Sequence, residues 1–329
     1  MPPPHALLDA ALRARLGGAV DDHSRYIPVR WHPVRRQLAY LERAVFCLRH
    51  RKQARAFLCI QQFIALYATY LARLFRLTLP PFFLQPIIYV PRRGIFGWLW
   101  RHLFTVALSH PALRIAFCHS QSEIEFYRRQ FPAAAAKFRP LRFTIEPLMP
   151  PEAPSHPPYL FSAGTSCRDY ATLFAAARRL PPETPPLHVA CKTADVQGLA
   201  APPNVQLFHD LWGPPYRQYL AGAASVIVPL LPLPVSAGQL VFLQAMSAGR
   251  PIVATRTPTS AEFLDDTCAW LVPPENPQAL AEAIAEALAR PELARQKAEV
   301  ARARFLARHS PDAIAQECAE ALATELGAI

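Results

Sequence analysis

Short apolar runs alternate with amphipathic stretches along the second half of the chain. Each run has four or five residues, and each amphipathic stretch carries apolar residues at helical spacing. This alternation predicts a parallel, doubly wound α/β sheet. The predicted strands are 159–163, 187–191, 205–208, 225–229, 252–255 and 269–272, the predicted helices are 170–179, 215–221, 239–248 and 279–289, and a helix-rich tail follows over 291–326.

The first half shows the same alternation less completely. Its uncharged run 56–72 approaches the length of a membrane span, but a strand followed by a helix explains these residues better. A complete nucleotide-binding domain opens on a strand and a glycine-rich turn, whereas this chain opens on prolines and a short helix over 5–16. We therefore expect a first domain that lacks its first β-α unit. The predicted strands are 56–60, 87–90, 113–118 and 142–145, with a helix over 63–76.

A proline-rich segment separates the two halves. Residues 146–158 contain six prolines, which neither a helix nor a central strand tolerates. We interpret 147–158 as a semi-rigid linker between a domain over 1–146 and a domain over 159–310. The length of 329 residues and the apolar content of 52% suffice for two packed cores.

Cysteine usage indicates a reducing compartment. The seven cysteines include no Cys-x-x-Cys pair, so a disulfide framework and a structural zinc site are both disfavoured. The N-terminus lacks the basic region and apolar core of a signal peptide. The expected location is therefore the cytoplasm.

Charge is divided unevenly between the halves. Residues 1–150 hold 22 Lys and Arg against 7 Asp and Glu, a balance of +15, while the remainder has a balance of −4. Arg92 and Arg93 precede Trp98 and Trp100, an interleaving typical of proteins that lie on anionic membranes. A solvated arginine-rich surface is the alternative. Nucleic acid is not expected as a partner, because neither an RNA-binding aromatic signature nor zinc-finger spacing is present.

The first strand of the second half ends in residues suited to an anion. Gly164 follows this strand directly, with Thr165 and Arg168 just after it. In an open α/β sheet, ligands bind outside the carboxyl ends of the strands, where helix starts and cations stabilise phosphate. Arg168 is therefore a candidate to bridge a diphosphate, although an ordinary exposed arginine is the alternative.

Two further strand ends belong to the same predicted edge. Lys192 follows the second strand and supplies a point charge for phosphate. Asp210 and Leu211 follow the third strand, where backbone groups are able to contact a base. Each of these residues alone is weak evidence for a ligand site. The prediction rests on their lying at the same edge of the sheet.

The segment 235–255 reads as a helix start, a helix, a turn at Gly249 and a buried strand. Small residues and free backbone N–H groups at its beginning predict a phosphate cradle. The cradle residues are Ser236, Ala237, Gly238, Gln239 and Leu240.

Three stretches in this order and spacing resemble the carboxyl-terminal domain of family 4 retaining glycosyltransferases of the GT-B fold. They are 161–174 with Arg168-Asp-Tyr-Ala-Thr-Leu-Phe174, the segment 229–255, and 271–284. The resemblance covers about residues 159–310. It implies two Rossmann-like domains facing across a cleft, a nucleoside-diphosphate sugar held by the second, and a last helix within 311–329 that packs back toward the first.

The resemblance also implies roles for individual residues. Gly164 and Thr165 would lie beneath the donor phosphates. Thr165 stands where the family commonly has a second arginine. Arg168 would stabilise the departing diphosphate. The N–H groups of Gln239 and Leu240 would bind phosphate. Gln244 stands where the family has a glutamate that binds ribose hydroxyls, and Ser236 stands at the motif's first glutamate. Both motif acids are therefore replaced.

The expected function is retaining transfer of a sugar from a nucleoside-diphosphate sugar to a glycan or lipid-linked acceptor. Neither a cofactor nor a metal is expected, since Arg168 and helix-start donors can offset the developing charge and no Asp-x-Asp is present. Cell-envelope polysaccharide biosynthesis at the inner membrane face fits this function. A non-catalytic nucleotide- or glycan-binding protein is the main alternative, and an epimerase would need acid/base groups that the sequence does not supply convincingly. His119 and His102 are candidates for the general base only because they are expected at the rim of the site.

Overall fold

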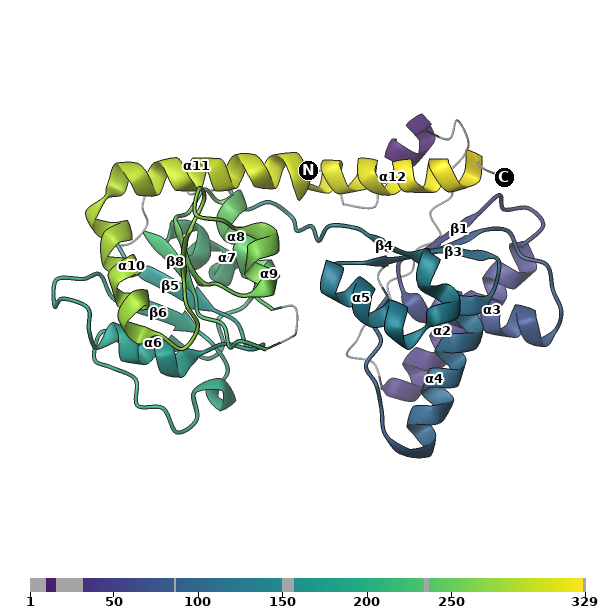
Figure 1. The fold of residues 1–329 in the computed structure, drawn as a ribbon, viewed down its shortest axis with the longest axis horizontal. Helices are drawn as coiled ribbons and strands as arrows, with labels where there is room; N and C mark the ends of the chain where they lie inside the picture. The colour runs from purple at the N-terminus through teal and green to yellow at the C-terminus, as the bar shows by residue number, and fades with distance from the viewer. Residues whose placement is uncertain (1–9, 16–31, 86, 150–156, 234–236, 328–329) are drawn as a thin grey trace. The chain divides into compact units, whose positions relative to one another are not determined.

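The chain forms two compact units. The structure, a computed structural model, describes residues 10–15, 32–85, 87–149, 157–233 and 237–327. One unit comprises Met1–Arg142 with Ile314–Ile329, and the other comprises Phe143–Ala313 (Figure 1). Each unit has its own parallel sheet.

The division between the units lies earlier than the predicted linker. It falls after Arg142, and residues 150–156 of the predicted linker 147–158 lie outside the described residues. The segment that begins at Phe143 already packs on the second unit. There, the Thr144 hydroxyl donates to the His309 carbonyl at 2.6 Å, and Leu148 N–H donates to Ser247 Oγ at 3.0 Å. These bonds explain why 142–145, predicted as a strand, is an irregular connection.

The second unit contains the doubly wound sheet that the alternation predicts. Its six strands pair in parallel in the order β10-β9-β8-β5-β6-β7, so the strand order reverses between β5 and β8. The strands are β5 (Leu160–Ala163), β6 (Leu187–Ala190), β7 (Val205–Phe208), β8 (Ser225–Val228), β9 (Ile252–Thr255) and β10 (Trp270–Val272).

Helices cover both faces of this sheet, because successive strand residues point to opposite sides. Phe161 of β5 joins a core with Phe242 and Phe305, and its neighbour Leu160 joins a second core with Phe174 and Ile284. The helices are α6 (Tyr170–Ala177), α7 (Gly213–Gly222), α8 (Gln239–Ser247), α9 (Pro258–Phe263), α10 (Pro277–Ala289) and α11 (Pro291–Arg308). Helices α7, α8, α9 and α11 contribute to the first core, and α6, α10 and the beginning of α11 to the second.

The first unit has a four-stranded parallel sheet. Its order is β1-β2-β3-β4, so the described strands follow chain order without a reversal. The elements are α2 (Pro33–His50), β1 (Phe57–Cys59), α3 (Gln62–Leu74), β2 (Phe82–Leu84), α4 (Gly94–Ser109), β3 (Leu113–Cys118), α5 (Gln121–Gln130), a 3-10 helix (Pro132–Lys137) and β4 (Phe138–Pro140). Of the helix predicted over 5–16, residues 10–15 are described and are helical.

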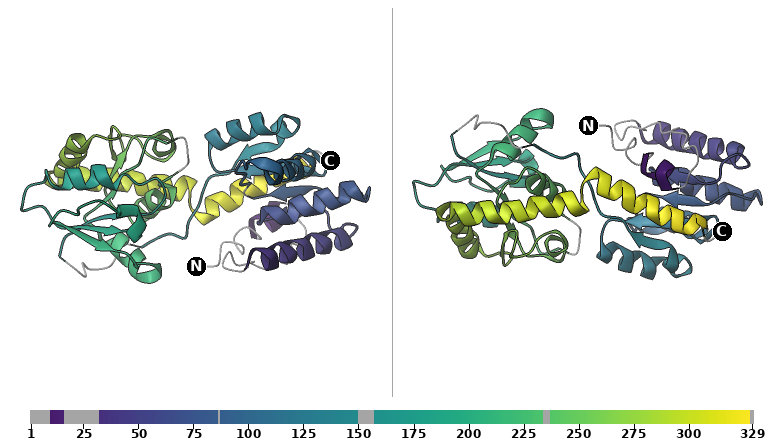
Figure 2. Two further views of the ribbon diagram at one scale, coloured as in Figure 1. Left: turned by 90° about the horizontal axis from the view of Figure 1, so that it is seen from below. Right: turned by 90° about the horizontal axis from the view of Figure 1, so that it is seen from above.

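The last helix, α12 (Pro311–Gly327), belongs largely to the first unit. From Ile314 onward it is part of that unit, and its Cys318 and Leu322 share a core with Phe83 and Phe117 of the sheet. The helix lies along one face of this sheet (Figure 2). Among the described residues, no helix is both long and apolar enough to cross a bilayer.

The strand predicted at 87–90 is wrong, and the strand of this region is β2. The alternation at 87–90 is real, since Ile87 and Tyr89 are buried while Ile88 is exposed. However, the Ile88 N–H and carbonyl pair with the side-chain amide of Gln62, at 2.7 and 2.9 Å. Ile87 N–H still donates to the Phe117 carbonyl of β3 at 2.9 Å, but the Gln62 side chain takes the bonds of Ile88 that a neighbouring strand would make.

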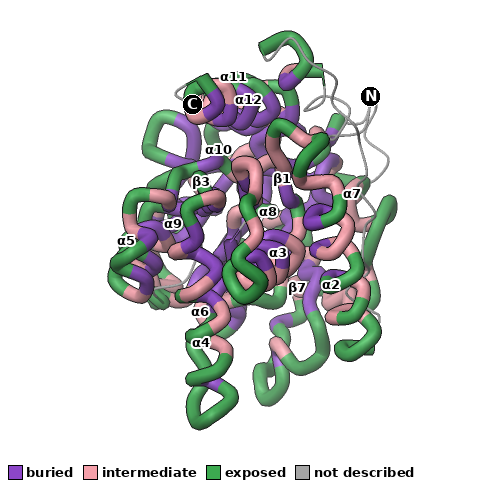
Figure 3. The backbone as a smooth tube through the Cα atoms, turned by 90° about the vertical axis from the view of Figure 1, so that its right-hand side faces the viewer, coloured by how far each residue is buried: buried purple, intermediate pink, exposed green. Residues whose placement is uncertain are grey.

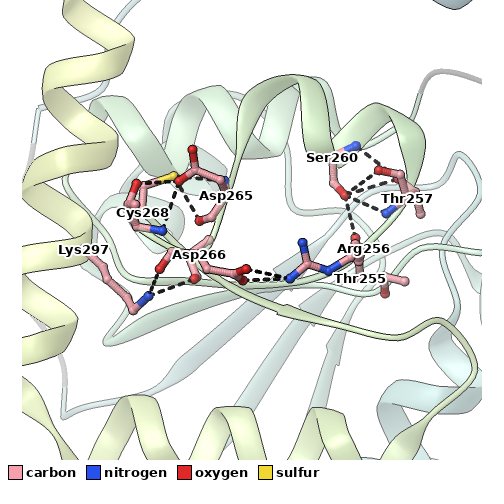
Figure 4. A network of polar contacts seen from close by, with 10 residues as sticks. Thr255, Arg256, Thr257, Ser260, Asp265, Asp266, Cys268 and Lys297 are labelled. Atoms are coloured by element: carbon pink, nitrogen blue, oxygen red, sulfur yellow. Dashed lines mark hydrogen bonds and ion pairs between the residues drawn. The ribbon is translucent and has the colours of Figure 1, made fainter.

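A polar network holds the segment that follows β9 in the second unit (Figure 4). The Ser260 hydroxyl donates to the Thr255 carbonyl at 2.8 Å, and Thr257 caps α9. Arg256 pairs with Asp266 at 2.7 Å. The Thr255 hydroxyl also accepts Leu230 N–H at 2.9 Å, so this network supports the loop that follows β8.

Candidate functional site

The loops after β5 and β8 are joined to each other at the reversal of the strand order. Arg168 and Leu230 form an isolated antiparallel bridge. Leu231 N–H donates to the Cys167 carbonyl at 3.0 Å, and Asp169 N–H donates to the Pro229 carbonyl at 3.2 Å. In doubly wound sheets this reversal is where the crevice for a ligand opens. The predicted residues Gly164 and Arg168 therefore lie at this position of the sheet.

Gly164 allows the Arg168 side chain to fold over the end of β5. Its φ of +118° is a conformation that residues with a Cβ rarely adopt. A Cβ placed at 164 would lie 2.7 Å from the Arg168 Cζ. The guanidinium donates from Nε to the Ala163 carbonyl and from Nη1 to the Ser166 carbonyl, both at 2.8 Å. The side chain is therefore held in place.

Arg168 is a positive charge without a partner anion. Burial lowers the pKa of its guanidinium, and within the described part of the chain it forms no ion pair. Asp195 acts on it electrostatically, but that carboxylate accepts Lys192 N–H at 2.8 Å. The two bonds to carbonyls use two of the five guanidinium N–H groups. The others are available to an anion.

Two tyrosines, the buried Tyr170 and the half-buried Tyr216, interact electrostatically with this guanidinium. The Tyr170 hydroxyl donates to the Gly164 carbonyl at 2.5 Å. Burial raises the pKa of Tyr170 well above its usual value and that of Tyr216 to about 12. Both hydroxyls are therefore neutral at neutral pH, so neither offsets the charge of Arg168.

The start of α8 offers backbone donors beside these loops. Gly238 is its N-cap, with φ +87°, and no side chain of the described residues caps the helix. By contrast, Asp169 caps α6 by accepting Thr172 N–H at 2.9 Å. The Nε2 atom of Gln239 is buried and has no hydrogen-bond partner among the described residues. An anion at α8 would satisfy donors that the fold leaves unpaired.

Close packing fixes Gly238. A Cβ at this position would lie 2.8 Å from Phe242 Cζ and 3.2 Å from Leu230 Cδ1. Neighbouring Ala237 is buried, and Leu240 is exposed on the first turn of α8. Ser236 lies outside the described residues, so its predicted role stays a prediction.

Gln244 lies buried on α8 and contacts a residue that the sequence analysis missed. Its Oε1 accepts a hydrogen bond from the Tyr216 hydroxyl at 2.8 Å. Tyr216 comes from α7, and its pKa responds to the charge of Arg168. It therefore lies between Arg168 and Gln244. The local sequence around Tyr216 carries no signal of this, because the contact joins two helices across the fold.

The other predicted residues share the sheet edge without contacting this cluster. Lys192 and Asp210 are exposed at the ends of β6 and β7, and Leu211 is half-buried against the core. Thr165 is exposed in the loop after β5. The structure thus brings together Gly164, Arg168, Gly238, Gln239 and Gln244, and it leaves Lys192, Asp210 and Leu211 farther along the edge.

The predicted residues of the first unit divide into exposed and packed groups. Arg92, Arg93 and Trp98 are exposed. Trp100 instead packs against Phe63, with ring centroids 5.5 Å apart, and the Arg92 guanidinium lies 4.4 Å above its ring. Trp100 is therefore largely a structural residue rather than part of an open surface.

The two candidate histidines also differ. His119 follows the end of β3 and bonds through Nδ1 to the Leu141 carbonyl at 3.1 Å. His102 lies on α4, stacked 5.6 Å from Trp98, and its role as a base stays a prediction. Within the described residues, no group of three or more His, Cys, Asp or Glu is placed to hold a metal ion.

Comparison with known proteins agrees with this architecture. Residues 173–290 match the family model described as "Glycosyl transferases group 1". Comparison with curated protein sequences finds no match. The family match lies within residues 159–310, the part of the chain that resembles glycosyltransferases.

Solved structures share the fold. Anabaena HepE in complex with UDP is 14% identical with a TM-score of 0.66, covering 85% of this chain and 82% of its own. Sucrose-phosphate synthase from Thermosynechococcus elongatus is 19% identical with a TM-score of 0.65, covering 94% and 82%. A glycosyltransferase from Rickettsia africae is 14% identical with a TM-score of 0.64, covering 93% and 84%. The predicted GT-B fold with two Rossmann-like domains is confirmed.

Proposed function

We propose that the chain transfers a sugar from a nucleoside-diphosphate sugar to a glycan or lipid-linked acceptor. The observation that carries this proposal is the Arg168 guanidinium at the strand-order reversal, which has no ion-pair partner among the described residues, together with the start of α8, which no described side chain caps. A diphosphate is the anion whose charge and size suit both features. Support comes from HepE, which shares the fold and has been solved with UDP and with UDP-glucose.

The proposed reaction retains the anomeric configuration. The anomeric carbon exchanges its bond to the diphosphate oxygen for a bond to an acceptor hydroxyl oxygen on the same face, and the departing diphosphate takes the hydroxyl proton. Arg168 and the N–H groups of Gln239 and Leu240 stabilise the charge that develops on the departing diphosphate. In this proposal the protein's own donors do so without a metal ion.

Incubation of the protein with a panel of nucleotide sugars and glycan or lipid-linked acceptors tests the function. We expect a glycosylated product, and NMR of its anomeric proton should show the configuration of the donor. Calorimetric binding of a nucleotide sugar without product would support the non-catalytic alternative instead. Absence of both binding and product across the panel would remove the proposal.

The acceptor and its location form a further part of the proposal. The first unit is strongly basic, which suits an acceptor held at the anionic cytoplasmic face of a membrane. We infer a role in cell-envelope polysaccharide synthesis, in which the acceptor is a lipid-linked glycan. Extension of such an acceptor in isolated membranes, compared with a water-soluble glycan, would test this inference.

A carboxylate at Gln244 should strengthen donor binding. If Gln244 binds the ribose diol, Gln244→Glu replaces a neutral bond with a charge-assisted one, and we expect UDP affinity to rise about tenfold. The Tyr216 hydroxyl is placed to donate to the new carboxylate. Isothermal titration calorimetry with UDP measures the change.

The matched control is a second Gln-to-Glu change on the same helix. Gln239→Glu brings negative charge to the predicted phosphate end of α8, so UDP affinity should fall. Equal effects of the two substitutions on affinity would show that Gln244 does not contact ribose.

A further inference from the structure

An exposed apolar surface lies at the beginning of α4 and in the loop before it. Its members are Ile88, Val90, Ile95, Phe96, Trp98 and Leu99, each 50% to 77% exposed, and we call these six residues the α4 surface. Figure 3 shows this end of α4 as an exposed projection of the chain. The rest of α4 is anchored, since Phe104, Ala107 and Leu108 lie in the core of the first unit.

The α4 surface is held in shape by its supporting contacts. The Gln62 amide pairs with both backbone groups of Ile88. The Tyr127 hydroxyl accepts Tyr89 N–H at 3.2 Å. Gly97 packs so closely on the preceding loop that a Cβ there would lie 2.5 Å from the Arg92 carbonyl carbon. A partner would therefore meet a preformed surface, which lowers the entropy lost on binding.

The stretch of sequence that contains the α4 surface is positively charged. Between Glu42 and Glu123 the chain has eleven Lys and Arg and no Asp or Glu. Arg92, Arg93 and Arg101 flank the apolar side chains, and none of them forms an ion pair in the described part of the protein. An apolar patch flanked in sequence by arginines is complementary to the interface of an anionic bilayer, where lipid tails and phosphates lie side by side.

We propose that the α4 surface docks on an anionic lipid bilayer. Phe96 and Trp98 enter the boundary between headgroups and acyl chains, while Arg93 and Arg101 contact lipid phosphates. A second copy of the chain fits less well, because self-association through this surface would bring the same arginines together. Since α4 follows the carboxyl end of β2, docking would hold this edge of the first unit at the membrane. Docking would bring the chain to a lipid-linked acceptor, and this consequence rests on the proposed function.

Flotation with lipid vesicles tests the docking without donor or turnover. The intact chain should float with vesicles of 30% phosphatidylglycerol in phosphatidylcholine, and not with phosphatidylcholine alone. Phe96→Ser/Trp98→Ser should lower the vesicle partition coefficient by about tenfold or more, because two large apolar side chains no longer enter the bilayer. Val300→Ser/Leu306→Ser, which changes two exposed apolar residues of α11, should leave it unchanged.

Salt and a charge reversal test the electrostatic part. Raising the ionic strength from about 0.05 to about 0.5 M should weaken binding, because salt screens the attraction between exposed charges. At low salt, Arg93→Glu should also weaken binding, because it replaces a positive charge by a negative one. No flotation at low salt, equal flotation with neutral vesicles, or an unchanged Phe96→Ser/Trp98→Ser variant would overturn the proposal. So would concentration-dependent dimers, seen by sedimentation velocity, that this variant abolishes. Because UDP binding is measured separately by calorimetry, failure here is distinguishable from failure of the proposed function.

Discussion

Replacing Arg168 by alanine should lower turnover by about 10²- to 10³-fold, the usual effect of removing one donor that stabilises developing charge. Arg168 is held over Gly164 by two carbonyls and has no ion-pair partner among the described residues, so a departing diphosphate is the group it would stabilise. Arg168→Lys should recover part of the loss, because it keeps the charge without the planar set of donors. Initial rates at saturating donor measure these effects.

Arg179→Ala provides the matched control. Arg179 is an exposed arginine close to the end of α6, and its Nη1 bonds to a carbonyl at 2.7 Å. Its removal should leave turnover unchanged. Melting temperatures of both variants must be compared with the native protein, because Arg168 also bonds to the backbone. Full activity of a folded Arg168→Ala variant would exclude Arg168 from catalysis.

Replacing Phe242 by alanine should destabilise the second unit by about 3–5 kcal/mol, the usual cost of emptying a large aromatic core position. Phe242 is fully buried on α8 and packs 6.3 Å from the Phe263 ring. It also lies against Gly238, so its loss should loosen the start of α8 and weaken UDP binding. Urea unfolding followed by circular dichroism measures the free energy of unfolding.

Leu240→Ala is the control on the same helix. Leu240 is 49% exposed, so its truncation should change the free energy of unfolding by less than about 1 kcal/mol. A Phe242→Ala variant as stable as Leu240→Ala would contradict the packing described for α8. A protein with two units can unfold in more than one transition. The variants should therefore be compared by the transition in which the second unit unfolds.

The two units differ in how far their folds follow from local sequence. In the second, strands buried on both faces stand out as short apolar runs, and all six lie where the alternation predicts them. In the first, alternating burial at 87–90 looks like a strand, yet Gln62, distant in sequence, pairs with its backbone. Tertiary contacts of this kind leave no local pattern.

The candidate site shows the same limit. Glycine and arginine after a strand predict an anion position from the connectivity of parallel sheets, so Gly164 and Arg168 follow from sequence. Tyr216 does not, because its bond to Gln244 joins two helices. On α4 the apolar residues are nearly continuous, so sequence alone does not separate packed Trp100 from exposed Phe96.

A crystal structure of the protein with UDP tests the central claim most directly. The account predicts the diphosphate within hydrogen-bond distance of the Arg168 guanidinium and of the N–H groups of Gln239 and Leu240, with the ribose near Gln244. A diphosphate bound elsewhere on the protein, or an unliganded site in crystals grown at saturating UDP, would contradict it.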